Sequence, residues 1–97
     1  MADIIEWIGV LEASCADYPA PSAEELAAAP LLERWRFAFA RGERGPSLVG
    51  TVIGHPRLGD RPGVVTSMLL ALDPDRRWAR THSRIYRLGA EAEEMLH

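Results

Sequence analysis

The chain contains no lysine, so all eleven of its positive side chains are arginines. It also has a single cysteine, Cys15, which excludes a disulfide within the chain. The longest apolar run, residues 68–72, is far shorter than the about 20 residues that a membrane-spanning helix needs. The N-terminus lacks the basic region and the long apolar segment of a signal peptide. We therefore expect a cytoplasmic protein that does not contact a membrane.

The motifs of common catalytic and cofactor sites are missing as well. No Cys/His spacing typical of zinc is present, and neither is a P-loop, a Gly-x-Gly-x-x-Gly string or a Gly-x-Ser-x-Gly elbow. The hydroxyls of Thr66, Ser67, Thr81 and Ser83 belong to no nucleophile elbow, and we expect them to form cross-strand hydrogen bonds. We predict no enzymatic activity, no cofactor and no metal.

What the chain does contain is typical of one folded domain. Its 97 residues are 47% hydrophobic and 26% charged, which is ordinary for a globular protein and unlike a disordered one. We expect residues 1–97 to form a single α+β domain with one core.

The N-terminal part, residues 1–29, predicts two helices. Apolar residues recur along one helical face, and this face is expected to be buried: Ile4, Ile8, Leu11, Cys15 and Tyr18, widened by Ile5, Trp7 and Val10. The Tyr-Pro-Ala-Pro segment at 18–21 ends this helix. Ser22 and Glu25 have the spacing of a capping box, which predicts a second helix over 23–29.

From Trp35 the pattern changes to period two. Residues 35–39 alternate aromatic with Arg or Ala, so that Trp35, Phe37 and Phe39 are expected to face the helices. Residues 41–46 predict a turn, 48–53 a strand, 54–63 a loop and 64–70 a third strand. The local pattern over 77–88 favours a helix by spacing, although several of its residues are strand formers.

An ordered string of short motifs bears on that ambiguity. Gly54-His55-Pro56 is followed by Thr66-Ser67 and then by Thr81-x-Ser83-Arg84-x-Tyr86-Arg87-Leu88-Gly89. The string resembles a group of small alphaproteobacterial proteins of unknown function. The resemblance implies that residues 77–88 form a strand, with residues 73–77 as a hairpin turn, and it brings no activity with it.

The resulting expectation is an α+β fold in which two N-terminal helices pack on a four-stranded antiparallel β-meander. The sheet is predicted to lie within residues 34–88 and to be followed by an acidic tail at 89–97. His55 is expected to cap a turn by hydrogen bonding rather than to act as a base or ligand. Cys15 is expected to pack as a small apolar side chain, and Asp73 and Asp75 to stabilise a turn.

Charge is segregated along the chain. The first 33 residues hold seven acidic and no basic residues, residues 34–87 hold eleven arginines and four acidic residues, and the tail adds three glutamates. Arginines that alternate with aromatics can bind a partner or phosphate groups. The predicted partner-binding residues are Arg76, Arg77, Arg80, Arg84, Arg87 and Tyr86. The alternative is that these arginines pair with the acidic helices of the same chain.

We expect a small non-enzymatic interaction protein that covers a surface of a larger protein partner. A specific version is an inhibitor of a bacterial defence complex, encoded by a phage or mobile element and comparable to anti-CRISPR proteins in size, acidity and lack of motifs. The alternative is a nucleic-acid-binding regulator that uses the C-terminal Arg/aromatic strand. The net charge of −3 argues against that alternative. Homodimer formation is left open by the sequence.

Overall fold

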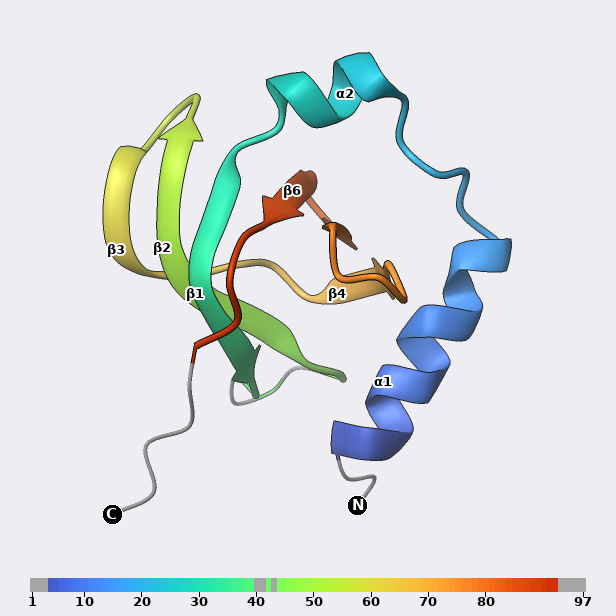
Figure 1. Ribbon diagram of the computed structural model, residues 1–97. Coiled ribbons are helices and arrows are strands. Elements are labelled where there is room, and N and C mark those ends of the chain that lie inside the picture. The colour runs from blue at the N-terminus through green and yellow to red at the C-terminus, as the bar shows by residue number, and fades with distance from the viewer. Residues whose placement is uncertain (1–3, 40–41, 43, 93–97) are drawn as a thin grey trace.

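A computed structural model describes residues 4–39, 42 and 44–92 (Figure 1). The chain forms helices α1 (Ile4–Ala13) and α2 (Ala23–Ala28) with the short 3-10 helix η1 (Ser14–Ala16) between them. Six strands follow: β1 (Leu31–Ala38), β2 (Ser47–His55), β3 (Gly59–Val65), β4 (Leu69–Leu72), β5 (Trp78–Thr81) and β6 (Ile85–Leu88). No helix in the described ranges combines the length and the apolar character needed to cross a membrane.

The predicted fold class is wrong, because the sheet is larger and mixed. Its strand order is β3-β2-β1-β6-β5-β4, and the central pair, β1 and β6, is parallel. Two three-stranded antiparallel meanders, β1–β3 and β4–β6, are thus joined along one parallel seam (Figure 1). The seam continues beyond β6, where Trp35 and Glu91 form a parallel bridge.

Two turns create the additional strands. The predicted strand at 64–70 is interrupted at Thr66, whose hydroxyl accepts a hydrogen bond from the Leu48 amide (3.0 Å) and donates to the Ser67 carbonyl (2.8 Å). The predicted strand at 77–88 is divided by a turn after Thr81, whose hydroxyl bonds both the amide and the carbonyl of Arg84. Hydroxyl side chains that bond nearby backbone groups compete with sheet pairing and favour turns. The predicted turn at 73–77 is confirmed, since it connects β4 to β5.

The helices pack on the second meander, with α1 against β4 and α2 against β6. Leu11 is fully enclosed, and Ile4, Ile8, Cys15 and Tyr18 are half-buried, so the predicted inner face is confirmed. Ile5 and Val10 do not widen it, because their exposed fractions are 76% and 54%. The capping box of α2 is present: the Ser22 amide donates to the Glu25 carboxylate, and the Glu25 amide donates to the Ser22 hydroxyl.

The core lies between the two meanders. Trp35 and Leu32 from β1 meet Leu48 and Val52 from β2, and residues of β4 to β6 such as Leu72 close the other side. The Trp35 indole donates from Nε1 to the Gly89 carbonyl (3.0 Å), which ties β1 to the segment after β6.

The prediction that three aromatics of β1 face the helices is wrong in part. Trp35 is 1% exposed and Phe37, half-buried, packs edge-on against it, whereas Phe39 lies beyond the end of β1 and is 56% exposed. Trp35 is linked to the segment after β6, through its indole bond to the Gly89 carbonyl and its bridge to Glu91.

A β-bulge in β1 determines which side of the sheet each of its side chains lies on. Glu33 pairs with Thr51 and Arg36 pairs with Val49, so Arg34 and Trp35 together oppose the single residue Gly50. Arg34 has a φ of 52°, in the left-handed region that a non-glycine residue seldom adopts. The bulge directs Trp35 into the core, where the backbone of Gly50 leaves room for it.

Candidate functional site

Four of the six predicted partner-binding residues use their side chains within the chain itself. These are Arg76, Arg77, Arg80 and Arg87. Each contacts either an acidic side chain or a backbone carbonyl of another segment. The intramolecular alternative therefore accounts for the placement of these four, and their contact with a partner stays a prediction.

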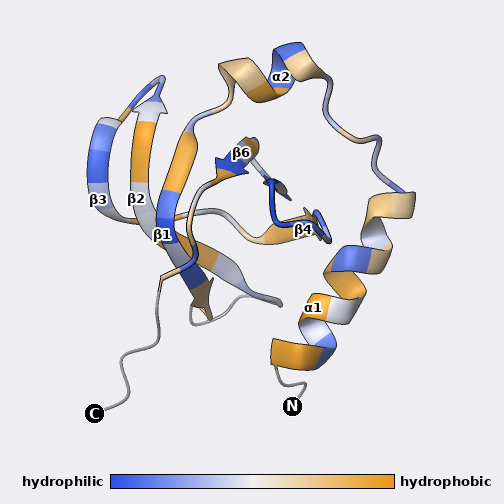
Figure 2. Ribbon diagram, in the orientation of Figure 1, coloured by the Kyte–Doolittle hydropathy of each residue, from blue (hydrophilic) through white to orange (hydrophobic). Residues whose placement is uncertain are grey.

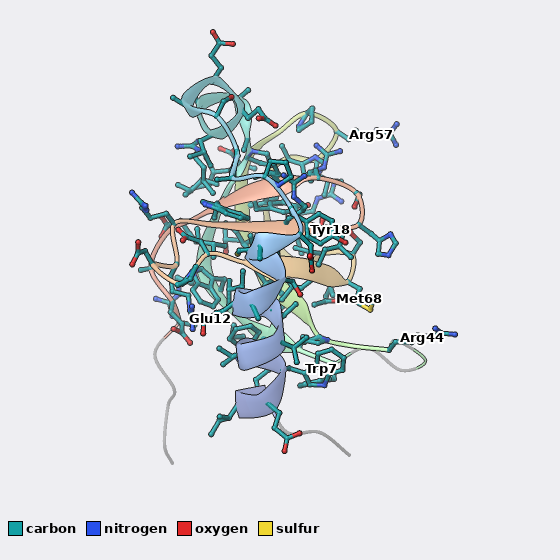
Figure 3. The ribbon with its side chains drawn as sticks, turned by 90° about the vertical axis from the view of Figure 1, so that its right-hand side faces the viewer. Trp7, Glu12, Tyr18, Arg44, Arg57 and Met68 are labelled. Carbon is teal, nitrogen blue, oxygen red and sulfur yellow. The ribbon has the colours of Figure 1, made fainter. Side chains whose placement is uncertain are left out.

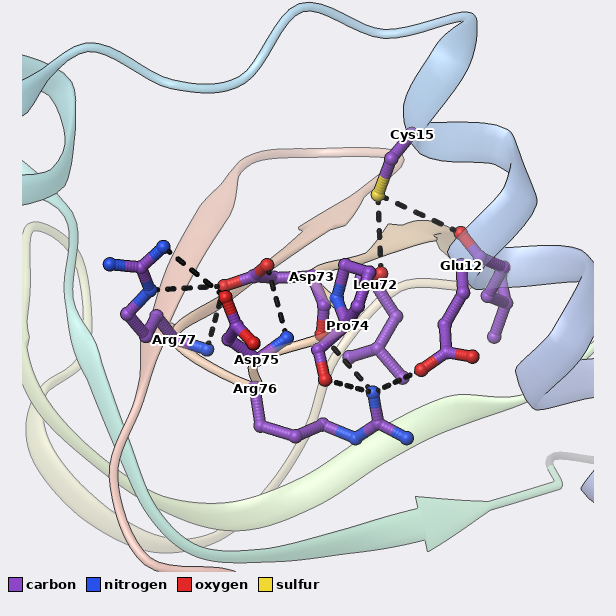
Figure 4. A network of polar contacts seen from close by, with 9 residues as sticks. Glu12, Cys15, Leu72, Asp73, Pro74, Asp75, Arg76 and Arg77 are labelled. Carbon is purple, nitrogen blue, oxygen red and sulfur yellow. Dashed lines mark hydrogen bonds and ion pairs between the residues drawn. The ribbon is translucent and has the colours of Figure 1, made fainter.

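Arg76 connects the turn between β4 and β5 to α1 (Figure 4). Its Nη1 donates to the Glu12 carboxylate (2.7 Å) and to the carbonyls of Asp73 (3.1 Å) and Pro74 (3.2 Å). The residue has a φ of 60°, so the turn holds it in the left-handed region. Arg76 thus fixes the position of α1 against the sheet.

The same turn is organised by the buried carboxylate of Asp73. Its oxygens accept hydrogen bonds from the backbone amides of Asp75 (3.2 Å) and Arg77 (3.0 Å), which confirms the predicted turn role of Asp73. Arg77 also lies 3.5 Å from the carboxylates of Asp73 and Asp75. Its side chain is 74% exposed, and exposed ion pairs of this kind stabilise by at most about 1 kcal/mol.

Arg80 and Arg87 hold the N-terminal segment to the sheet. Arg80 donates to the Pro19 carbonyl (3.1 Å) and lies over the Tyr18 ring at 5.7 Å, a cation–π distance. Arg87 donates from Nε to the Ala29 carbonyl (3.0 Å) at the end of α2. Both arginines stabilise the link between the two helices and the second meander.

Cys15 is part of the same contact between α1 and β4. Its thiol donates to the Leu72 carbonyl at 3.2 Å (Figure 4). Burial raises the pKa of this thiol, and the charges of Asp73 and Glu12 act in the same direction. The predicted packing role agrees with this position. Among the described residues, no group of three or more His, Cys, Asp or Glu side chains is placed to hold a metal ion.

Arg84 and Tyr86 have different surroundings. Tyr86 is 4% exposed and its ring lies 6.3 Å from that of His55. Arg84 is half-buried and forms no ion pair with a described carboxylate. Arg80 lies in β5 and Tyr86 in β6, because the turn after Thr81 divides the strand predicted over 77–88.

Sequence reasoning missed a second set of arginines. Six arginines form neither an ion pair nor a side-chain hydrogen bond within the part of the chain that the structure describes, and five of them lie outside the predicted set: Arg34, Arg36, Arg44, Arg57, Arg61 and Arg84. Figure 3 shows Arg44 and Arg57 extending away from the body of the molecule.

The first meander has an open side, which we call the outer sheet face. Strand register places its residues on one side of the sheet: Leu31 beside Ile53, Glu33 beside Thr51, and Arg36 beside Val49, which in turn lies beside Val65. Ile53 and Val65 are 40% and 55% exposed, and Arg36 is exposed as well. The helices pack on the other half of the molecule (Figure 1). The face therefore presents aliphatic side chains beside an unpaired arginine.

The edge of this meander is hydrophilic, in contrast to its centre. Figure 2 shows β3 mostly in blue, whereas β1 and β2 carry orange segments. Pro62 and Gly63, with a φ of 64° at Gly63, interrupt the edge strand. Such interruptions hinder pairing of an edge with another strand, so the open side of the sheet is a better contact surface than its edge.

His55 ends β2 and closes the turn to β3. Its Nδ1 accepts hydrogen bonds from the amides of Arg57 (3.0 Å) and Leu58 (3.1 Å), which confirms the predicted turn cap. Burial lowers the pKa of His55, and the charges of Arg84 and Arg57 lower it further. The predicted cross-strand bonds of the hydroxyls are wrong, because Ser67 and Ser83, whose oxygens lie 2.6 Å apart, both lie in turns outside the strands.

Replacing His55 by Asn is expected to change how stability depends on pH. The unfolded histidine gains a proton with a pKa of about 6.5, whereas the folded one resists protonation because its pKa is lowered. Neutral His55 therefore contributes fully to the free energy of unfolding of the wild type above pH about 6.5, and this contribution decreases as the pH falls below that value. The Asn oxygen can accept the same two amides without titrating. Urea unfolding at several pH values measures the free energy of unfolding of both proteins. If this free energy depended on pH in the same way in the wild type and in His55→Asn, the prediction would be contradicted.

Comparison with known proteins adds a family and no activity. No curated protein and no solved structure matches the chain. The sequence resemblance to uncharacterised proteins is confirmed at the level of a family of unknown function, while the motif string and the alphaproteobacterial source stay predictions. Because the family model matches residues 3–96, the chain belongs to the family of unknown function DUF6634.

Proposed function

We propose that this protein is a small non-enzymatic interaction protein that covers a surface of a larger partner through its outer sheet face. The observation that supports the proposal is the open side of β1–β3, where exposed Ile53 and Val65 lie on the same face of the sheet as Arg36. Single exposed apolar residues are common on protein surfaces, but several on one sheet face together with an arginine are typical of interfaces.

The size of the molecule suits such a role. An interface of standard size takes about 800 Å² from each partner, and the whole chain exposes 6413 Å². One face of a small sheet can supply that area. The pleat also gives a flat surface on which every second side chain points toward the partner.

Charge indicates what the partner presents. Arg34 and Arg36 are exposed and form no ion pair with described residues, and Glu33 is the one acidic residue in the set that defines the outer sheet face. A partner with acidic and apolar side chains complements this face. Two copies joined face to face would instead bring their arginines together, so a homodimer through this face is disfavoured.

The finer predictions depend on the identity of that partner. An inhibitor of a bacterial defence complex and a cytoplasmic location both remain proposals, made by analogy of size and charge. The nucleic-acid alternative gains no support from the four predicted arginines, since their side chains already contact the chain itself.

The double variant Arg36→Glu/Val65→Thr is expected to weaken partner binding at least tenfold, because it reverses one charge and removes apolar contact while keeping a β-branched residue in β3. The measurement is co-purification from a host lysate with quantitative mass spectrometry, followed by a binding isotherm with the captured protein.

The matched control is Arg44→Glu/Val10→Thr, which changes an exposed arginine and an exposed valine away from the outer sheet face. It should bind as the wild type does. Equal loss in both double variants, or loss in the control alone, would reject the outer sheet face as the binding surface.

A further inference from the structure

The side of His55 that faces away from its turn is a fixed hydrogen-bond donor. Because Nδ1 accepts from two backbone amides, a neutral ring carries its proton on Nε2. The Nε2 atom has no hydrogen-bond partner among the described residues, and it is not one of the polar atoms sealed from solvent. His55 thus presents one N–H group with a determined direction and no acceptor.

Tyr86 supplies a second donor beside it. The two rings lie 6.3 Å apart and are tilted by 38°, so the end of β2 contacts β6. No described residue hydrogen-bonds the Tyr86 hydroxyl, and this oxygen also remains open to solvent. Burial raises the pKa of Tyr86, which keeps the hydroxyl protonated at neutral pH.

Arg84 adds a positive charge from a rigid turn. Its amide donates to the Thr81 hydroxyl (3.2 Å), and its carbonyl accepts from the Thr81 amide and hydroxyl (2.9 Å each). Arg84 precedes Tyr86 by two residues, so both side chains lie on the same face of this segment. The guanidinium acts electrostatically on both rings, and no described carboxylate pairs with it.

Arg57 carries a second positive charge in the turn between β2 and β3. It follows His55 by two residues, and its charge also acts on the imidazole. Its side chain is exposed and extends into solvent in Figure 3. A long unpaired side chain in this position is free to fold over a ligand bound at Arg84.

We propose that His55, Arg57, Arg84 and Tyr86 form a binding site for the phosphate group of a small phosphate monoester. Two guanidinium groups match the two charges of the dianion, and two neutral donors can reach its remaining oxygens. A carboxylate carries one charge and two oxygens, so it would leave part of this set unused. The site goes beyond the proposed function, because it requires no protein partner.

The test is a titration of the full chain at pH about 7.5, where a monoester is almost fully dianionic because its second pKa is about 6. Chemical-shift changes are followed with inorganic phosphate, a mononucleotide, a sugar phosphate and acetate, each up to about 10 mM. Saturable shifts at Arg84 and Tyr86 with phosphate are expected. Of the mononucleotide and the sugar phosphate, the one that binds more tightly identifies the class of ligand. Acetate should bind at least tenfold more weakly than phosphate.

The variants separate binding from folding. Arg84→Gln should weaken phosphate binding at least tenfold while the melting temperature stays close to that of the wild type, and Tyr86→Phe should weaken it without removing the ring. Arg36→Gln is the matched control and should bind phosphate unchanged. Absence of saturable shifts, equal binding of acetate, or equal loss in Arg36→Gln would overturn the site. Binding of a duplex oligonucleotide that phosphate does not displace would also overturn it.

Discussion

Trp35→Ala is expected to leave the chain largely unfolded at room temperature. Removing a fully buried tryptophan costs about 3–5 kcal/mol through lost apolar contact and the cavity that remains. Trp35 is 1% exposed and contacts both meanders, and its indole also bonds Gly89. A domain of this size has a total stability of about 5–15 kcal/mol, so the loss is a large part of it. Circular dichroism and urea unfolding measure the effect.

Two further variants show whether the effect belongs to this position. Trp35→Phe keeps an aromatic ring but loses the bond to the Gly89 carbonyl, so it should cost less than the alanine variant. Phe37→Ala should also cost less, since Phe37 is half-buried at the margin of the core. A Trp35→Ala protein that unfolds at the urea concentration of the wild type would show that the core lies elsewhere.

Gly50→Ala is expected to be the second most damaging change, at about 3 kcal/mol, the upper part of the range for overpacking. An added Cβ would lie 2.8 Å from the Glu33 carbonyl oxygen and 3.1 Å from the Trp35 Cα, both of them backbone atoms. Backbone cannot rotate away as a flexible side chain does, so β1 and β2 would have to separate at the bulge.

Gly9→Ala is the control for Gly50→Ala because it adds the same methyl group. Apart from the chain neighbours and the backbone of its own helix, no described atom lies within 4 Å of the Cβ position at Gly9, and alanine favours a helix interior by about 1 kcal/mol over glycine. The control should therefore raise the melting temperature while Gly50→Ala lowers it. If both changes shifted the melting temperature in the same direction, the close approach at Gly50 would not limit the packing of these strands.

Local signals in the sequence identified the elements that local forces determine. The capping box at Ser22, the inner face of α1 and the Asp73 turn all depend on residues a few positions apart, and all are present. The turn-capping role of His55 was accessible for the same reason, since its Nδ1 bonds amides two and three residues away.

The remaining features depend on contacts between distant residues. The parallel pairing of Leu31 with Arg87 leaves no periodic signal in either segment, so the sheet was expected to be purely antiparallel. Thr66 and Thr81 are good strand formers by type, yet their hydroxyls terminate strands by bonding Leu48 and Arg84. Likewise, the clustering of the C-terminal arginines along the sequence suggested that they bind a partner. Which arginines are exposed and form no ion pair depends on the folded structure and cannot be read from their spacing in the sequence.

The parallel seam has a consequence for the order in which the chain can fold. The other strands of both meanders lie between Leu31 and Arg87 in the sequence, so this pairing closes a long loop. Closing so long a loop costs entropy before any contact repays it, and folds with distant pairings are slow. During synthesis, β1 emerges with one edge unpaired and waits for β6, the last strand to be made. In the nascent first meander β1 is therefore an open edge strand, and during that interval it is exposed to pairing with another chain.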